Sequence, residues 1–323
     1  MKTESPLRWG ILGCARITRR GLIPGIRASR TGVLHALASR DGNAAAAWAR
    51  EFDVPRAYGS YQEVLDDPET DAVYIPLPNE LHKPWVLAAA DAGKHILCEK
   101  PLALDASEAQ AMVAHCEARG VLLMEAFMWR HQPRTAALAR LVAGGTIGAL
   151  RLVRSSFSFP IDLGDWRLDE ARGGGALWDV GCYGVNTVRL YAGTEPEAVQ
   201  AVARFTPGGA DLSLAAALRF PDGVLGVVDC SFEQPFRCTY ELVGSDGVIE
   251  VPDAYLPPAR PIARLVKDGR TEELTFEGGD QYGAMVDAFG ESLANGGGLA
   301  SPAENGLAQM QTLDAIRTAA KRA

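Results

Sequence analysis

The sequence has few of the residues that build metal centres and disulfide frameworks. Its six cysteines include no C-x-x-C pair, and its five histidines form no H-x-x-H or H-E-x-x-H grouping of the kind that zinc sites use. Several of the cysteines lie in apolar, strand-like runs, which is typical of reduced core residues in a cytoplasmic protein. We therefore expect no metal site and a cytoplasmic location.

The chain also lacks a long hydrophobic run and an excess of positive charge. No apolar segment is long enough to span a bilayer, and the N-terminal residues MKTESPLRWG contain no segment of signal-peptide length. The formal net charge of −8 argues against nucleic acid or an anionic membrane as the main partner. With 323 residues, of which 47% are hydrophobic, the chain is long enough for two globular domains.

The first half of the chain alternates between two hydrophobic patterns. Short apolar runs typical of buried strands are found at residues 7–12, 33–39, 72–76, 95–98 and 121–125. Helical patterns lie between most of them, at residues 44–52, 60–66, 80–92 and 107–119. This alternation predicts an α/β domain with a doubly wound parallel sheet of the Rossmann, or dinucleotide-binding, type.

A phosphate-binding turn is expected directly after the first strand. The strand runs into the sequence GCARIT (13–18), where a helix N-terminus would meet the pyrophosphate of a dinucleotide. The glycine motif is degenerate, because Ala15 and Thr18 replace its second and third glycines. Ala15 still allows the backbone to approach the pyrophosphate closely. The candidate cofactor-binding residues of this turn are Gly13, Cys14, Ala15, Arg16 and Ile17.

The end of the second strand indicates which dinucleotide binds. Enzymes that use NAD usually carry an acid there, which binds the ribose hydroxyls. This chain has Ser39-Arg40-Asp41 instead, so a 2′-phosphate would not be repelled and Arg40 could pair with it. We expect Asp41 to cap the following helix. The sequence therefore predicts NADP(H) as cofactor, with a solvated Arg40 in a loop as the alternative.

A lysine stands where the strand at residues 95–98 should end, within Glu99-Lys100-Pro101. Open α/β folds bind their ligands at the carboxyl edge of the sheet, so Lys100 would lie at that edge. An ammonium group in a closing cleft can stabilise negative charge on a substrate oxygen. The alternative is a solvated surface lysine beside a turn proline.

The second half has a different pattern, with strand-like runs joined by turns rich in glycine and proline. The runs lie at residues 150–159, 198–205, 212–220, 224–230, 239–244 and 248–251. They predict an α+β domain with an open-faced, mostly antiparallel sheet. Helices would cover one face of this sheet, and self-association could cover the other.

One helix of the second half carries a candidate catalytic pair. Asp179 and Tyr183 are four residues apart in a helical pattern at about residues 177–192, so they face the same side of that helix. Alone, the pair would be interpreted as a capping acid and a core tyrosine. Together with Lys100, the pair favours a catalytic role.

Five motifs are spread over both halves of the chain: GCARIT (13–18), PNELH (78–82), EKP (99–101), EAFMWR (125–130) and GGGALWDVGCY (173–183). In this combination the sequence resembles the glucose–fructose oxidoreductase/inositol dehydrogenase family. Most of that family has a histidine four residues after the motif aspartate, whereas this chain has Tyr183. The tyrosine makes the chain most similar to the dimeric dihydrodiol dehydrogenases and the NADP-dependent D-xylose dehydrogenases.

The resemblance implies roles for these motifs. Lys100 and Asp179 would line the nicotinamide pocket, with Tyr183 as the proton-transfer group and a cis peptide bond between Lys100 and Pro101. Further cofactor-binding residues would be Pro78, Asn79, His82 and Glu99. The candidate substrate-binding residues are Trp129, Arg130, Phe157, Trp166, Arg167 and Tyr282. For the aromatic residues among them, core packing is an equal alternative.

The resemblance also implies a domain organisation. A dinucleotide-binding domain is expected at residues 1–126, and a substrate-binding and oligomerisation domain at residues 127–323. An alternative for the last helix is to pack against the first domain. A homodimer or homotetramer would form through the open face of the second sheet.

These residue types fit one kind of chemistry. Hydride transfer belongs to the cofactor, so the protein must position the substrate carbon and handle one proton. The Lys100 ammonium would favour the phenolate of Tyr183, which could then exchange a proton with the substrate hydroxyl. The prediction is an NADP-dependent dehydrogenase acting on a cyclic polyol, such as an aldopyranose or a trans-dihydrodiol. The alternatives are a keto-sugar or dicarbonyl reductase and a non-catalytic, dinucleotide-sensing regulator on the same fold.

Overall fold

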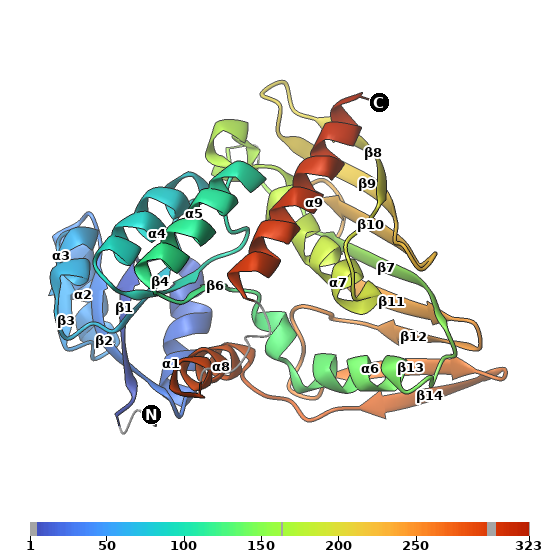
Figure 1. The fold of residues 1–323 in the computed structure, drawn as a ribbon, viewed down its shortest axis with the longest axis horizontal. Coiled ribbons are helices and arrows are strands. Elements are labelled where there is room, and N and C mark those ends of the chain that lie inside the picture. Colours follow the sequence, from blue (N-terminus) through green and yellow to red (C-terminus); the bar gives the residue numbers. More distant parts are fainter. Residues whose placement is uncertain (1–4, 163, 296–301, 323) are drawn as a thin grey trace. The chain divides into compact units, whose positions relative to one another are not determined.

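The computed structural model describes residues 5–162, 164–295 and 302–322 (Figure 1). Contacts between Cα atoms divide the chain into two compact units. Unit 1 comprises Met1–His131 and Asp280–Leu307, and unit 2 comprises Gln132–Gly279 and Ala308–Ala323. Residues 127–131 and 280–307, which were expected in the second domain, therefore group with the first unit.

Unit 1 contains a six-stranded sheet in the order β3-β2-β1-β4-β5-β6, and all its pairings are parallel. Its strands are β1 (Leu7–Leu12), β2 (Gly32–Ala38), β3 (Arg56–Tyr58), β4 (Ala72–Ile75), β5 (His95–Cys98) and β6 (Leu123–Glu125). The strand order reverses between β1 and β4, which is the place where doubly wound folds bind their ligands. The predicted Rossmann fold is confirmed.

The helices of unit 1 begin and end at the signals that the sequence contains. They are α1 (Ile23–Ala28), α2 (Gly42–Glu51), α3 (Tyr61–Asp66), α4 (His82–Asp91), α5 (Ala106–Arg119) and α8 (Gln281–Asn295). Ser60 and Glu63 form a capping box before α3, and Gly120 ends α5 in the left-handed conformation at φ 67°. A π-helical turn, Thr18–Leu22, precedes α1.

Unit 2 contains an eight-stranded sheet in the order β14-β13-β12-β11-β7-β10-β9-β8. Its strands are β7 (Leu150–Ser158), β8 (Ala198–Phe205), β9 (Asp211–Arg219), β10 (Leu225–Ser231), β11 (Arg237–Gly244), β12 (Gly247–Val251), β13 (Ile262–Lys267) and β14 (Arg270–Thr275). Among the described strands of this sheet, only β10 and β7 pair in parallel. The sheet is therefore mostly antiparallel, as predicted.

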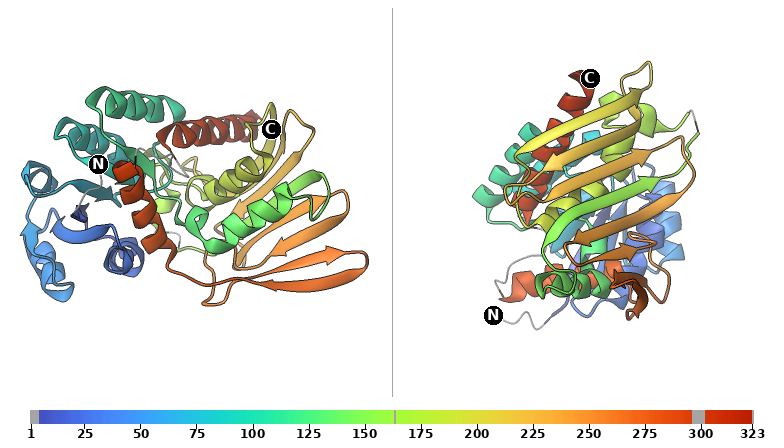
Figure 2. Two further views of the ribbon diagram at one scale, coloured as in Figure 1. Left: turned by 60° about the horizontal axis from the view of Figure 1, so that its bottom comes forward. Right: turned by 90° about the vertical axis from the view of Figure 1, so that its right-hand side faces the viewer.

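Helices cover one face of this sheet. Unit 2 contains α6 (Pro133–Ala143), α7 (Cys182–Ala192) and the part of α9 (Ala303–Arg322) that begins at Ala308. A π-helical turn, Leu177–Gly181, leads into α7, which packs on β7 and β10. Figure 2 shows the other face, on which no helix of the described unit 2 residues lies. Within the described ranges of the chain, no helix is both long enough and apolar enough to cross a membrane.

Candidate cofactor-binding and active-site residues

The turn after β1 has a backbone that only glycine adopts readily. Gly13 has φ +124°, and its N–H donates to Ala38 O at 2.9 Å. A Cβ built on Gly13 would lie 3.0 Å from Leu77 Cδ2, so a side chain would crowd the turn. Residues 14–17 remain partly or fully exposed before the π-helical turn begins at Thr18. This close-approach turn fits the pyrophosphate of a dinucleotide.

The residues after β2 divide into a helix cap and an exposed cation. The Asp41 carboxylate accepts from Asn43 N at 2.9 Å and from Ala44 N at 3.4 Å, so Asp41 caps α2. The Ser39 hydroxyl accepts from Asp41 N at 3.1 Å. Arg40 is exposed. Asp41 is therefore occupied with the helix, which leaves Ser39 and Arg40 as the groups that could meet a 2′-phosphate.

Tyr61, which the sequence analysis did not select, lies beside both of these elements. Its hydroxyl is 3.7 Å from the position that a Cβ on Gly13 would take, and its ring packs edge-on against Trp85 at 5.0 Å. Burial raises the pKa of Tyr61, while the charge of Arg40 and a hydrogen bond from it act in the opposite direction. Tyr61 therefore connects the Gly13 turn with Arg40. No local sequence signal reports this contact.

Lys100 follows β5 directly, at the same edge of the sheet as Gly13. The bond between Lys100 and Pro101 is cis, as predicted. The Glu99 carboxylate accepts from the Tyr74 hydroxyl at 2.5 Å and from Lys100 N at 3.2 Å. These contacts give Glu99 a structural role in shaping the turn that carries Lys100.

His82 is completely buried and clamps two backbone segments together. Its Nε2 lies 2.8 Å from Leu77 O, and its Nδ1 lies 3.0 Å from Pro101 O. Burial lowers the pKa of His82, so the ring is neutral and donates from one nitrogen at a time. We therefore assign His82 to holding the Pro101 turn, instead of the cofactor contact that the resemblance implied. Pro78 and Asn79, at the start of the same short segment after β4, remain cofactor candidates.

The substrate-binding candidates of unit 1 divide by burial. Trp129 is completely buried in the turn Met128–His131, whereas Arg130 is partly exposed. Tyr282 of α8 packs on Gly21, where a Cβ would lie 2.5 Å from the Tyr282 Cζ. Burial raises the pKa of Tyr282. Trp129 therefore has the packing role that was left open as its alternative, whereas Tyr282 is partly exposed and remains a candidate for substrate binding.

In unit 2, Asp179 forms an ion pair with Arg167. Arg167 Nε donates to Asp179 Oδ2 at 2.9 Å, and Arg167 Nη1 contacts both carboxylate oxygens of Asp165 at 3.1 and 3.2 Å. Burial alone would lower the pKa of Arg167, but the charges of Asp179 and Asp165 outweigh burial and raise it. Asp179 was expected to line the nicotinamide pocket, as was Lys100. The structure adds Arg167, itself a candidate for substrate binding, as a partner within unit 2.

Tyr183 is buried between two aromatic rings. It is 7% exposed, lies edge-on to Phe157 with ring centroids 5.5 Å apart, and lies against Tyr255 at 4.9 Å. Phe157 thus backs Tyr183, although it was selected as a substrate-facing residue. Trp166 is partly exposed and stacks with the Arg167 guanidinium at 5.2 Å.

A buried acid holds the start of the helix that carries Asp179 and Tyr183. Asp211 Oδ2 accepts from Leu177 N at 2.7 Å. Its Oδ1 lies 2.2 Å from where a Cβ on Gly175 would be, and Gly175 has φ +125°, so only glycine fits there. Burial raises the pKa of Asp211 to about 6. Asp211 and Tyr255 were not selected from the sequence because both lie far along the chain from the motif that they support.

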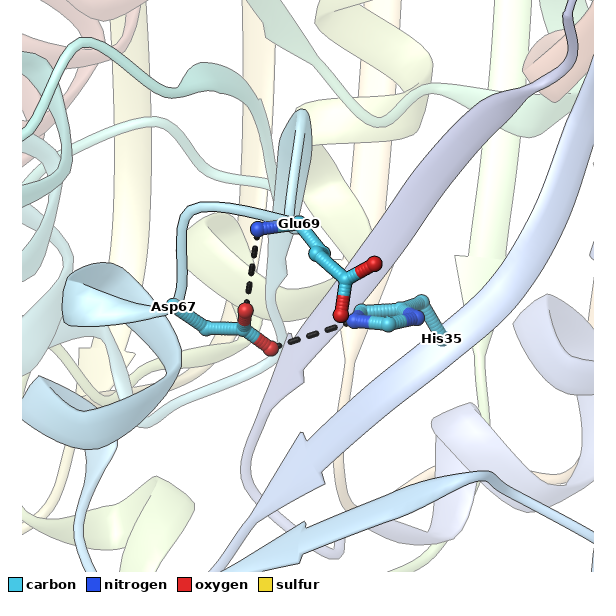
Figure 3. A group of neighbouring side chains, drawn as sticks. All are labelled: His35, Asp67 and Glu69. Atoms are coloured by element: carbon cyan, nitrogen blue, oxygen red, sulfur yellow. Dashed lines mark hydrogen bonds and ion pairs between the residues drawn. The ribbon is translucent and has the colours of Figure 1, made fainter.

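The described residues include one cluster with the spacing of a metal site. His35, Asp67 and Glu69 place one ligand atom each within 4.8 Å of one another, and His35 Nε2 lies 3.1 Å from Asp67 Oδ2 (Figure 3). However, Arg56 contacts Glu69 and lies 3.5 Å from Asp67, and Arg8 lies 3.6 Å from Glu69. The carboxylates are already neutralised by arginines, so we assign this cluster to structure and not to a metal ion.

Comparisons with known proteins agree with this arrangement. A family model for an oxidoreductase family with an NAD-binding Rossmann fold matches residues 7–127, and a model of the GFO/IDH/MocA C-terminal domain matches residues 135–250. The D-xylose 1-dehydrogenase (NADP(+)) 2 of Haloferax volcanii is 41% identical over 320 residues, with 98% of each chain covered.

Two further relatives extend the comparison. The trans-1,2-dihydrobenzene-1,2-diol dehydrogenase of Mus musculus is 35% identical over 270 residues, which cover 83% of this chain and 79% of the mouse protein. The crystal structure of a 3-ketoreductase from Actinomadura kijaniata in complex with NADP and TDP-benzene has a TM-score of 0.92 at 33% identity and covers 98% of both chains. The chain therefore belongs to the GFO/IDH/MocA oxidoreductase family, as the motifs of both its halves predicted.

Proposed function

We propose that the protein is an NADP-dependent oxidoreductase that transfers hydride between the nicotinamide and a hydroxyl or carbonyl carbon of a cyclic polyol. An aldopyranose or a trans-dihydrodiol is the expected substrate class. The observation that carries this proposal is the carboxyl edge of the unit 1 sheet. There Gly13 follows β1, Ser39 and Arg40 follow β2, and Lys100 lies two residues beyond the end of β5. A phosphate cradle, a phosphate-pairing cation and a catalytic cation thus share one edge of one sheet.

The names of the relatives support the proposed cofactor and substrate class. The Haloferax volcanii relative is named for D-xylose and NADP(+), and the mouse relative for a trans-dihydrodiol. Both substrates are rings with neighbouring hydroxyl groups. A pocket that binds such a ring needs a few polar groups and an apolar wall.

When bound, NADP(H) would accept or supply the hydride. In the oxidation direction, Tyr183 as phenolate would take the proton of the substrate hydroxyl while the carbon loses hydride. Lys100 would stabilise the phenolate and the developing charge on the substrate oxygen. The proposal requires Lys100 of unit 1 and Tyr183 of unit 2 to reach the same substrate. The Asp179–Arg167 ion pair would hold the substrate-facing end of the Tyr183 helix in shape.

A keto-sugar reductase is the second candidate, because the Actinomadura kijaniata enzyme of similar structure is named as a 3-ketoreductase. A single set of residues can catalyse both directions, so the two candidates differ in substrate and not in machinery.

Steady-state assays that follow NADPH absorbance in both directions test the proposal. The substrate panel should contain aldopyranoses, trans-dihydrodiols and keto-sugars. We expect NADP(H)-dependent turnover of at least one cyclic substrate. Tight NADP(H) binding without turnover of any of them would favour the dinucleotide-sensing regulator instead.

We further propose a homodimer or homotetramer in the cytoplasm. Val202 on β8 is 61% exposed and Leu225 on β10 is 48% exposed, and both belong to strands of the sheet in unit 2. Apolar side chains on a broad sheet face are typical of an interface. None of the six cysteines forms a disulfide bond, which suits a reducing compartment.

A further inference from the structure

A chain of buried hydroxyl groups ends at the backbone of Tyr183. Tyr255 Oη lies 2.7 Å from Ser155 Oγ on β7 and 2.7 Å from Thr187 Oγ1 on α7. Thr187 Oγ1 in turn donates to Tyr183 O at 2.8 Å. All three hydroxyl-bearing residues are buried. The Tyr255 hydroxyl therefore joins the central strand of the sheet to the helical turn that carries Tyr183.

The donors and acceptors in this chain have one consistent order. Each hydroxyl has a single proton. Because Thr187 donates to Tyr183 O, Thr187 must accept from Tyr255, whose proton is then no longer available to Ser155. Ser155 Oγ has two acceptors within reach, Tyr255 Oη at 2.7 Å and Thr239 O at 3.4 Å, and the shorter contact favours Tyr255. Burial raises the pKa of Tyr255, so its hydroxyl remains a donor. Hydrogen bonds aligned in one direction strengthen one another in a low-dielectric interior.

The loop that carries Tyr255 is held by a buried cation. The Arg134 guanidinium donates to Pro252 O at 2.9 Å, to Asp253 O at 2.9 Å and to Ala254 O at 2.9 Å. Arg134 is 1% exposed, and burial lowers its pKa. A guanidinium that donates to three successive carbonyls fixes the path of the backbone up to the residue before Tyr255.

The ring of Tyr255 completes the contact with Tyr183. The two ring centroids are 4.9 Å apart, while Phe157 lies 5.5 Å from each ring. We propose that Tyr255 is a positioning residue for the reaction, whose ring sets the orientation of the Tyr183 ring and whose hydroxyl fixes the backbone beneath it. This inference rests on the proposed role of Tyr183 in proton transfer.

Tyr255→Phe tests the inference because it keeps the ring and removes only the bridging hydroxyl. We expect kcat to fall about 10- to 100-fold, the range that a small misplacement of a reacting group can cost. The pH dependence of kcat should shift, because the proton-transfer group is displaced. The Kd for NADP(H), measured by calorimetry without substrate, should stay unchanged.

Tyr191→Phe is the matched control. Tyr191 is also a buried tyrosine with a hydroxyl partner, Tyr240 Oη at 3.0 Å. It lies on α7, about two turns beyond Tyr183. Both variants should lose a similar amount of thermal stability, but Tyr191→Phe should keep kcat and its pH profile. Equal effects of the two substitutions on kcat would overturn the inference.

Two further variants remain informative if Tyr255→Phe folds poorly. Thr187→Val removes the hydroxyl between Tyr255 and the Tyr183 carbonyl and should reproduce the loss of kcat. Thr187→Ser keeps that hydroxyl and should keep kcat near the wild-type value. In a Tyr183→Phe background, breaking the chain should cause no further loss, and an additive loss would contradict the inference. Full turnover of Tyr183→Phe alone would instead remove the proposed role of Tyr183, which is a separate result.

Discussion

At the end of β2, Ser39 and Arg40 stand where many dinucleotide-binding chains carry an acid. Asp41 cannot replace that acid, because its carboxylate caps α2. The Tyr61 hydroxyl lies close to Arg40 and to the Gly13 turn, so the cation has a nearby anchor on the unit 1 surface. Under the proposed function, discrimination between the two dinucleotides would depend on one exposed guanidinium.

Arg40→Ala should weaken NADP(H) binding by about 1.5–3 kcal/mol, since a charge-assisted hydrogen bond to the 2′-phosphate is lost. Binding of NAD(H) should change little, because NAD(H) lacks that phosphate. Calorimetric titration of both dinucleotides into wild type and variant measures the difference. Equal affinity of the wild type for the two dinucleotides would contradict the role of Arg40.

Tyr183→Phe should lower turnover by about 10²–10⁴, the usual range for a lost proton-transfer group, while NADP(H) binding and fold are kept. Stability should change little, because the ring remains packed between Phe157 and Tyr255. Lys100→Met should lose turnover as well, because the substrate oxygen would lack a cation. Turnover of Tyr183→Phe within a few-fold of wild type would assign the proton to Lys100 or to a water that it holds.

At the scale of elements, Asp211 links the stability of the fold around Leu177, where the helical segment with Asp179 and Tyr183 begins, to pH. Its pKa rises from 3.8 in the unfolded chain to about 6 in the fold, mainly through burial. The folded state therefore holds its proton more tightly. The contribution of Asp211 to the free energy of unfolding is fully present below about pH 4. It is lost as the pH rises to about 6, and the loss is about 3 kcal/mol for this group alone.

Asp211→Asn should remove this pH-dependent decrease in the free energy of unfolding. The amide oxygen can still accept from Leu177 N–H, while the buried charge is gone. Relative to wild type, the variant should gain stability between about pH 4 and pH 6 and then keep a constant advantage. Urea unfolding over this pH range checks the prediction. A wild type and variant with parallel pH profiles would mean that Asp211 does not titrate there.

The elements of unit 1 were predictable because their signals are local. Alternating apolar runs, the Ser60 capping box and Gly120 each act within a few residues. Short or exposed strands gave no such signal: β3 has three residues, and β14, of sequence RTEELT, has almost no buried side chain. The spacing of Asp179 and Tyr183 predicted a shared face of one α-helix, but Asp179 lies in the π-helical turn Leu177–Gly181 and Tyr183 lies in α7. Their supports, Arg167, Asp211 and Tyr255, come from segments that only tertiary structure brings together.

At the scale of the whole molecule, the uncovered sheet face of unit 2 should hold subunits together. Sedimentation velocity at micromolar concentration should show a dimer or tetramer for the wild type. Val202→Glu puts a charge on that face and should dissociate the oligomer into monomers. Val33→Glu is the control, because Val33 is an exposed apolar residue of unit 1. A wild type that sediments as a monomer would exclude this assembly.

The way in which Arg134 holds its loop has a consequence for variation and design. Its three contacts at Pro252, Asp253 and Ala254 are to main-chain carbonyls, which every amino acid possesses. The anchor therefore does not depend on the side chains at these positions, and their surroundings limit substitution instead: Ala254 is buried and Asp253 has φ +46°. The sequence of the loop beside the Tyr183 ring can vary, or the loop can be transferred as a unit, provided that its backbone keeps the same course and Arg134 is retained.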